Sequence, residues 1–263
     1  VQIRNRRPKT AIAKAAENAT PEIAALLREI DDVTCTLVEE YPDSPEAWDV
    51  IARFHYRMTE VDDAITYWKK CLDLNPDFAP ACQSIGLAYL ETGKHTESAE
   101  YFRRALQLMP TSPTIAVELS QALIADGKAA EGAKILRENI TQHPRSMAAL
   151  AMLGHACVTL REFAEAKQCF LRAIELGPDY TNAYDGLVKA CVNLGEEELA
   201  KEYAATLKLK KAQEAEIHRK ALKKHDDAEN IRLTMGETYV AAANVYLFHD
   251  APKIAERCLV RAM

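Results

Sequence analysis

One stretch of this 263-residue chain has glycines spaced as in the nucleotide-binding loops of other proteins. The segment GKAAEGAK, residues 127–134, has the glycine separation of a phosphate-binding loop. Such a loop needs a lysine directly after its second glycine and then a hydroxyl residue, whereas Ala133 and Lys134 follow Gly132 here. The sequence also lacks the GxGxxG, GxSxG and HExxH motifs. We therefore expect neither nucleotide binding nor catalysis.

The histidines offer one candidate metal site. His218 and His225 lie seven residues apart and would share a helix face with Glu214. The neighbouring sequence supplies no further ligands, so a solvated charged helix is the expected structure. His155 and Cys157 are two residues apart and therefore point to different faces of a helix. We predict no metal and no cofactor.

The seven cysteines are expected to be free thiols. Their number is odd and no CxxC pair occurs, so a disulfide framework is not expected. Cys71, Cys82, Cys157 and Cys191 fall within apolar helical stripes, where a free cysteine packs as a small hydrophobic residue. Reduced thiols favour a cytoplasmic location.

Basic residues are concentrated in the segment 208–224, against Glu214 and Glu216. This run could contact nucleic acid or an acidic partner, but no aromatic residue is interleaved on which a base would stack. The net charge of −6 also disfavours nucleic acid, so a solvated helix face is the expected role. The glycosylation sequons at Asn18 and Asn139 are not expected to be used in an intracellular chain.

The composition favours a helical globular chain. Charged residues make up 27% and hydrophobic residues 48%, and glycine is scarce at 9 residues. No alternating pattern of Val, Ile and Thr predicts a strand, and no run of about 18 apolar residues predicts a membrane helix. The sequence begins with Val1, from which we expect that an upstream segment is missing.

The helices that position these residues follow an internal repeat. Pro42, Pro76, Pro110, Pro144 and Pro178 are each 34 residues apart, a period typical of helical solenoids. Proline has no N–H to donate and disfavours helix in the residue before it, so each phased proline is expected to end a helix. Turns such as ETGKHTE and NLGEEE carry the glycine expected at a helix end.

Small and apolar residues recur in phase between these prolines. In the second unit they are Cys82, Ile85, Gly86, Tyr89, Ser98, Phe102 and Ala105. Each unit is expected to be two antiparallel helices whose i, i+3, i+4, i+7 stripes face each other and the next unit. Gly86 and Gly154 would let the first helix approach its partner closely, beside Phe102 and Phe170.

This pattern resembles the tetratricopeptide repeat family over most of the chain. The resemblance implies an all-α fold, a right-handed α-solenoid of helix-turn-helix repeats. It predicts a degenerate N-terminal capping helix in residues 1–44, regular repeats in 45–195, an extended helix in 196–230 and a sixth, out-of-register helix pair in 231–263. The extended helix is expected because Ala212 stands where the period demands proline. We expect one continuous solenoid that is a segment of a longer protein.

In this family the first helices of successive units line a concave groove that accepts peptides. The side chains expected to line it here are Arg53, Tyr56, Gln83, Leu87, Leu90, Val117, Gln121, Ile124, Ala151, His155, Val158 and Lys189. An apolar groove centre is typical of an interaction site, although some of these residues could instead pack between adjacent first helices. The chaperone-tail-binding subtype of the family is not expected, because Asp49 would repel a terminal carboxylate.

The predicted function is a non-catalytic scaffold that binds a protein or peptide segment in this groove. The alternative is an accessory domain of a larger enzyme, or of a secretion or assembly component, whose catalytic part lies outside the sequence. The last helix has no polar cap, so self-association through it is a third expectation. We predict no membrane insertion, and nucleic acid is not an expected partner.

Overall fold

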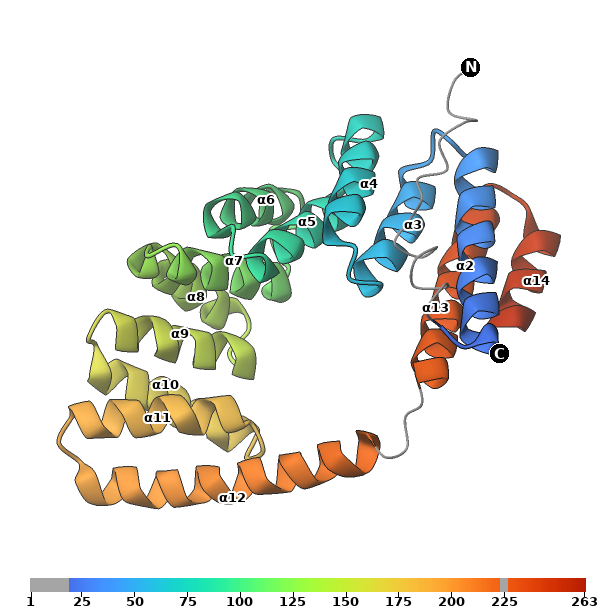
Figure 1. Ribbon diagram of the computed structural model, residues 1–263. Helices are drawn as coiled ribbons and strands as arrows, with labels where there is room; N and C mark the ends of the chain where they lie inside the picture. The colour runs from blue at the N-terminus through green and yellow to red at the C-terminus, as the bar shows by residue number, and fades with distance from the viewer. Residues whose placement is uncertain (1–18, 223–226) are drawn as a thin grey trace. The chain divides into compact units, whose positions relative to one another are not determined.

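The computed structural model describes residues 19–222 and 227–263. Over these residues the protein is an all-α solenoid without β-strands (Figure 1). In sequence order, first helices of 13 residues alternate with second helices of 14 residues from α3 to α11, and the longer helices α2, α12 and α13 precede or follow them. The helices are α2 (Pro21–Glu40), α3 (Pro45–Arg57), α4 (Val61–Leu74), α5 (Ala79–Glu91), α6 (His95–Leu108), α7 (Pro113–Ala125), α8 (Ala129–Gln142), α9 (Met147–Thr159), α10 (Phe163–Leu176), α11 (Thr181–Asn193), α12 (Glu197–Leu222), α13 (Asp227–Phe248) and α14 (Pro252–Ala262).

The helices form two compact units. The central unit comprises residues 82–221, from α5 to α12. The terminal unit joins segments from both ends of the sequence, because it contains α2, α3 and α4 together with α13 and α14. No helix in the described residues has the length and hydrophobicity needed to cross a membrane.

The phased prolines end the second helices, as predicted. The helices α2, α4, α6, α8 and α10 each end two residues before one of these prolines. Serines then begin several of the next first helices. The hydroxyl oxygens of Ser44, Ser112 and Ser146 accept hydrogen bonds from backbone N–H groups three residues further on. Each bond satisfies a donor in the first turn that has no partner within the helix.

The turn inside each helix pair has one residue with a left-handed backbone. Gly93, Gly127 and Gly195 have φ angles of 76°, 80° and 76°. Glycine adopts this conformation without a steric penalty because it has no Cβ. At the same place in the first and fourth pairs, Thr59 and Arg161 have φ angles of 62° and 61°. Two of these five turns therefore carry backbone strain.

Glycines allow close helix packing around aromatic rings, as predicted. A Cβ atom added to Gly86 would lie 2.8 Å from Cδ1 of Phe102. One added to Gly154 would lie 2.7 Å from the ring of Phe170, and one added to Gly186 would lie 2.1 Å from the same ring. The ring of Phe170 is therefore packed between first helices of two consecutive repeats.

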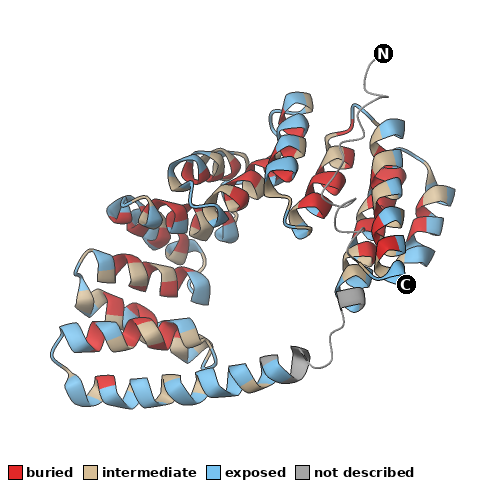
Figure 2. Cartoon of the chain, in the orientation of Figure 1, coloured by how far each residue is buried: buried red, intermediate tan, exposed pale blue. Residues whose placement is uncertain are grey.

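The boundary predicted for the extended helix is wrong. The helix α12 is 26 residues long and ends at Leu222, whereas residues 227–230 belong to α13. Among the described residues of α12 only Ala200 is buried, and Figure 2 shows most of this helix as exposed. Strong helix formers, rather than packing, sustain α12 over most of its length.

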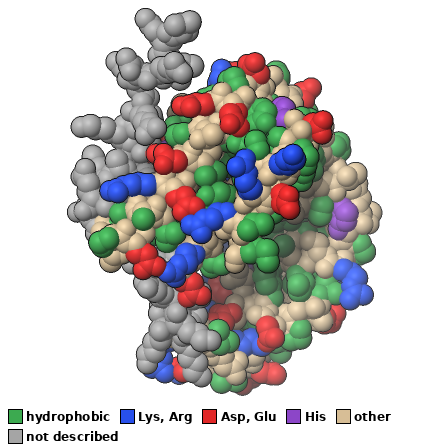
Figure 3. All heavy atoms as spheres, turned by 90° about the vertical axis from the view of Figure 1, so that its right-hand side faces the viewer, with side chains coloured by type: hydrophobic (Ala, Val, Ile, Leu, Met, Phe, Trp, Pro, Cys, Tyr) green, Lys and Arg blue, Asp and Glu red, His purple; other side chains and the backbone are tan. Residues whose placement is uncertain are grey.

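The core of the terminal unit draws side chains from four helices. They are Leu27, Ile30 and Leu37 of α2, Ala47, Val50 and Phe54 of α3, Met235, Tyr239, Ala242, Ala243, Val245 and Tyr246 of α13, and Ala255 and Cys258 of α14. The hairpin of α13 and α14 packs on α2 and α3 (Figure 1). On the molecular face in Figure 3, hydrophobic side chains lie among acidic and basic ones.

Candidate functional site

The first helices of the central unit carry most of the residues predicted to line a groove. We call these residues, on α5, α7, α9 and α11, the first-helix row. They are Gln83, Leu87, Leu90, Val117, Gln121, Ile124, Ala151, His155, Val158 and Lys189. The two other predicted residues, Arg53 and Tyr56, lie on α3 in the terminal unit.

The apolar members of the row are half-buried. Leu87 and Leu90 pack against the core cluster that contains Phe102. Val117, Ile124 and Val158 pack against the neighbouring cluster, which is formed mainly by α9 and α10. Each of these side chains therefore contributes to repeat stacking and also retains accessible apolar surface. Ala151 is only 2% exposed and offers little surface to a partner.

A hydrogen bond between repeats occurs at one end of the row. The Nε2 atom of Gln83 on α5 donates to Oε2 of Glu118 on α7 over 2.8 Å. Burial raises the pKa of Glu118, and the hydrogen bond from Gln83 opposes this shift. The carboxylate is therefore partly shielded from solvent and has a fixed neighbour.

The other end of the row contains a histidine and an ion pair. The ring of His155 lies edge-on to that of Phe170, with 5.0 Å between centroids. Burial and the charge of Lys189 lower the pKa of His155, so the imidazole is neutral at pH 7. Lys189 Nζ lies 2.6 Å from Oδ2 of Asp185, and this bond holds the pKa of Asp185 below its usual range. The charges near this end largely compensate each other.

The expectation that Asp49 would face a ligand is wrong. Asp49 is 4% exposed, and its Oδ1 atom accepts a hydrogen bond of 2.9 Å from the indole Nε1 of Trp68. Arg53 Nη2 lies 2.7 Å from the other carboxylate oxygen. Burial raises the pKa of Asp49, and Arg53 and Trp68 oppose the shift. Asp49 therefore holds Trp68 in place, and its charge gives no argument about carboxylate ligands.

The cysteines and the glycine-containing segment considered in the sequence belong to the helix packing and to a turn. Cys71, Cys82, Cys157 and Cys191 are buried, as predicted. Burial raises the pKa of Cys157 to about 12, so this thiol stays protonated at neutral pH. In the segment 127–134, Gly127 forms the turn before α8, whose Gly132 packs on the carbonyl of Ser120.

Some of the other residues considered in the sequence lie outside the described residues. Asn18, His225 and the side chain of His218 lie outside them, whereas Asn139 is buried on α8. Glu214 accepts a hydrogen bond of 2.8 Å from Thr181. In the basic segment, Lys210 pairs with Asp179 over 2.8 Å.

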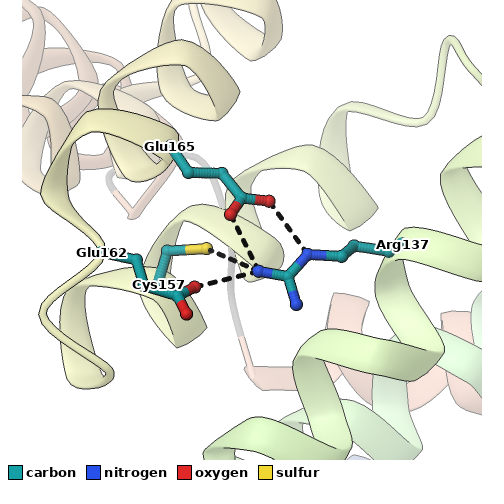
Figure 4. Close-up of polar contacts among 4 residues, drawn as sticks. All are labelled: Arg137, Cys157, Glu162 and Glu165. Atoms are coloured by element: carbon teal, nitrogen blue, oxygen red, sulfur yellow. Dashed lines mark hydrogen bonds and ion pairs between the residues drawn. The ribbon is translucent and has the colours of Figure 1, made fainter.

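A recurring arginine clamp between second helices was not anticipated. Arg137 on α8 donates to both carboxylate oxygens of Glu165 on α10, over 2.9 and 2.8 Å, and to Glu162 over 2.9 Å (Figure 4). One repeat earlier, Arg103 pairs with Glu131 over 2.7 Å. Both arginines and both partner glutamates recur at the 34-residue period, which is the signal that could have revealed the clamp.

Two clusters in the described residues bring metal-ligating atoms within 4.8 Å of one another. In the cluster of Cys157, Glu162 and Glu165, the guanidinium of Arg137 already lies where a cation would neutralise the carboxylates. In the other cluster, His55, Glu60 and Asp63, a ring nitrogen of His55 shares a hydrogen bond with Glu60. The His55 cluster therefore connects α3 to the start of α4. The ion pairs of Arg137 connect α8 to α10.

These features define a helical-repeat protein with an apolar row on its first helices. Residues 45–78, 79–112 and 148–180 match the tetratricopeptide repeat family. These three segments are therefore tetratricopeptide repeats. No curated protein matches its sequence significantly.

Solved structures support the same fold. MamA, whose crystal structure is known, is 20% identical in sequence to this chain, and the two structures superpose with a TM-score of 0.58. The similarity covers 63% of this chain and 97% of the MamA chain. YrrB, described as a TPR protein with an unusual peptide-binding site, is 15% identical, with a TM-score of 0.53 and coverage of 85% and 97%. Cut9, in the APC/C hetero-tetramer Cut9–Hcn1, is 15% identical with a TM-score of 0.59. That similarity covers 99% of this chain but only 46% of the other.

Proposed function

We propose that this chain is a non-catalytic scaffold that binds a protein or peptide segment along the first-helix row. The observation that carries the proposal is the set of half-buried apolar side chains on the first helices of successive repeats, of which Leu90, Ile124 and Val158 are 34 residues apart. Leu87, Leu90, Val117, Ile124 and Val158 keep accessible surface after the repeats have stacked. Apolar surface that a fold leaves accessible in one row favours a binding site. The peptide-binding site named for YrrB supports the same role.

The charges near the row indicate what kind of segment would bind. Glu118 is bonded to Gln83, Lys189 is paired with Asp185, and the pKa of His155 is lowered. A strongly charged ligand would therefore meet few uncompensated charges. An apolar segment, docked as a helix or as an extended peptide, fits this row best. Its affinity should depend weakly on salt concentration, because few ion pairs would form on binding.

The test uses peptides selected on the intact chain from a random library, with affinities measured by calorimetry. The groove variant replaces Leu87 and Ile124 by glutamine. The matched control replaces Leu106 and Ile135 by glutamine; both are half-buried against the core cluster that Leu87 also contacts, but they lie on the second helices α6 and α8. We expect the groove variant to lose at least about tenfold in affinity, the equivalent of roughly 1.4 kcal/mol, whereas the control should bind normally.

The paired design separates binding from stability. Both variants remove apolar groups of similar burial, so circular dichroism and urea unfolding should report similar losses for the two proteins. Equal affinities of the groove and control variants for the selected peptides would show that the first-helix row is not the binding surface.

A further inference from the structure

The α13–α14 hairpin contacts α2 through a row of polar pairs. Arg261 donates from Nε and Nη2 to the two carboxylate oxygens of Glu29, over 2.6 and 2.7 Å. Tyr239 also donates to Glu29, over 2.7 Å, and Arg232 pairs with Glu22. The pairs Glu22–Arg232 and Glu29–Tyr239 share an offset of 210 residues. The helices α2 and α13 therefore run in the same direction.

Aromatic contacts continue this row beyond the end of α2. The ring of Tyr41 lies edge-on to Tyr246, with 5.6 Å between centroids, and stacks on His249 at 4.2 Å. On α3, Arg57 pairs with Glu237. The hairpin is thus held along the whole of α2 and at the end of α3.

This contact has the layout of a protein interface, although it joins segments from the two ends of the sequence within one compact unit. Its centre is the apolar core of the terminal unit, and its rim consists of exposed ion pairs. The side chains of Arg57, Arg232 and Arg261 are 47%, 55% and 54% exposed. A hollow of about 510 Å³ lies beside α2 and is lined in part by Tyr246 and Cys258 of the hairpin. An apolar centre with a polar, solvent-accessible rim is the usual arrangement of an interface between two protein chains.

Little besides this contact fixes the hairpin in the described part of the chain. Outside its own hairpin, α13 packs on α2 and α3. The helix before it, α12, is exposed at every residue from Lys211 to Ala215. The interface with α2 and α3 therefore determines where the hairpin is held.

We propose that the α2–α3 hairpin is a docking surface for an α13–α14 hairpin and that a second copy of this chain supplies it by exchange. Two copies that trade hairpins form the same contacts as one copy alone, which is why exchange of identical elements is a low-cost route to dimers. Each docked surface then contains Arg232, Tyr239 and Arg261 of the other copy. The apolar centre supplies affinity, and the charged rim supplies the match between partners. This inference concerns the terminal unit and does not depend on the proposed function.

Two complementary full-length variants test the exchange. Glu29→Arg places like charges together within one chain, and so does Arg261→Glu. When the two variants are mixed, a reciprocal exchange restores opposite charges at both docked surfaces. Native mass spectrometry should therefore show more mixed dimer than either variant forms with itself, by roughly twofold to fivefold for each restored pair. Raising the salt concentration should reduce this preference.

A matched pair in the central unit provides the control. Arg103→Glu and Glu131→Arg reverse an ion pair of similar exposure that joins α6 to α8. Mixing these two variants should give no preference for mixed dimers. If the Glu29 and Arg261 variants also remain without mixed dimers at every concentration, the exchange proposal is wrong.

A cross-linking measurement covers the case in which the charge variants unfold the terminal unit. Glu22→Cys and Arg232→Cys are made in separate chains, each with Cys35→Ser to remove a half-buried native thiol. Oxidation of the mixture should give a covalent mixed dimer, and the chain with both substitutions should cross-link internally when dilute. Internal cross-linking together with a monomeric mixture would show that the hairpin stays on its own chain.

Discussion

At the residue scale, Asp49 shows how a buried charge serves packing. Its carboxylate accepts the indole N–H of Trp68, one of the largest fully buried side chains, and also binds Arg53. Asp49→Ala should lower the free energy of unfolding by about 1–3 kcal/mol, because the Trp68 donor is left buried without a partner. Asp49→Asn keeps an acceptor oxygen and removes the buried charge, so its cost should be smaller. Urea unfolding followed by tryptophan fluorescence measures both, and equal losses would contradict this role.

At the element scale, the five turns inside the helix pairs from α3 to α12 differ in one residue. Thr59 and Arg161 hold the left-handed conformation that Gly93, Gly127 and Gly195 hold in the other turns. Thr59→Gly should raise the free energy of unfolding by about 0.5–1 kcal/mol, since relief of strain exceeds the added entropy of the unfolded chain. Gly93→Ala should lower it by about 1 kcal/mol for the opposite reason, although open space surrounds Gly93. Thermal unfolding of both variants measures this difference, and a destabilised Thr59→Gly protein would refute the strain argument.

At the scale of the whole molecule, each unit contains a glutamate whose pKa an arginine lowers. Hydrogen bonds from Arg261 lower the pKa of Glu29 in the terminal unit, and those from Arg137 lower that of Glu165 in the central unit. The folded pKa of each group lies below its unfolded value of about 4.3. Each pair therefore stabilises the fold above that pH, and this contribution is lost as the pH falls through the folded pKa. Wild type should exceed the Glu29→Gln/Glu165→Gln variant in urea midpoint at pH 7 by more than it does at pH 3. A constant difference between these pH values would exclude the two pairs as its source.

The sequence predicted local structure well because the repeat constrains it. The phased prolines, the turn glycines and the close approach of Gly86 and Gly154 to aromatic rings follow from backbone chemistry that acts over a few residues. The contact of Tyr239 with Glu29 could not be predicted. The 34-residue period relates only adjacent repeats, whereas these two residues are 210 positions apart in the sequence. The burial of Asp49 was also missed, since its position borders the apolar stripe and only the nearby indole of Trp68 decides its orientation. The row of apolar residues on the first helices was predictable from spacing, whereas their half-burial depends on how the repeats stack.

The distance in sequence between α2 and its partner has a consequence for synthesis. Glu29 and Arg261 are separated by 232 residues. At the usual elongation rates of 5–20 residues per second, the ribosome needs about 10–50 s to extend the chain from Glu29 to Arg261. During that interval the apolar face of α2 lacks the α13–α14 hairpin that packs on it in the folded protein. The central repeats, in contrast, can already pack on their immediate neighbours. Chaperones that recognise exposed apolar segments on emerging chains would find that helix available throughout this interval.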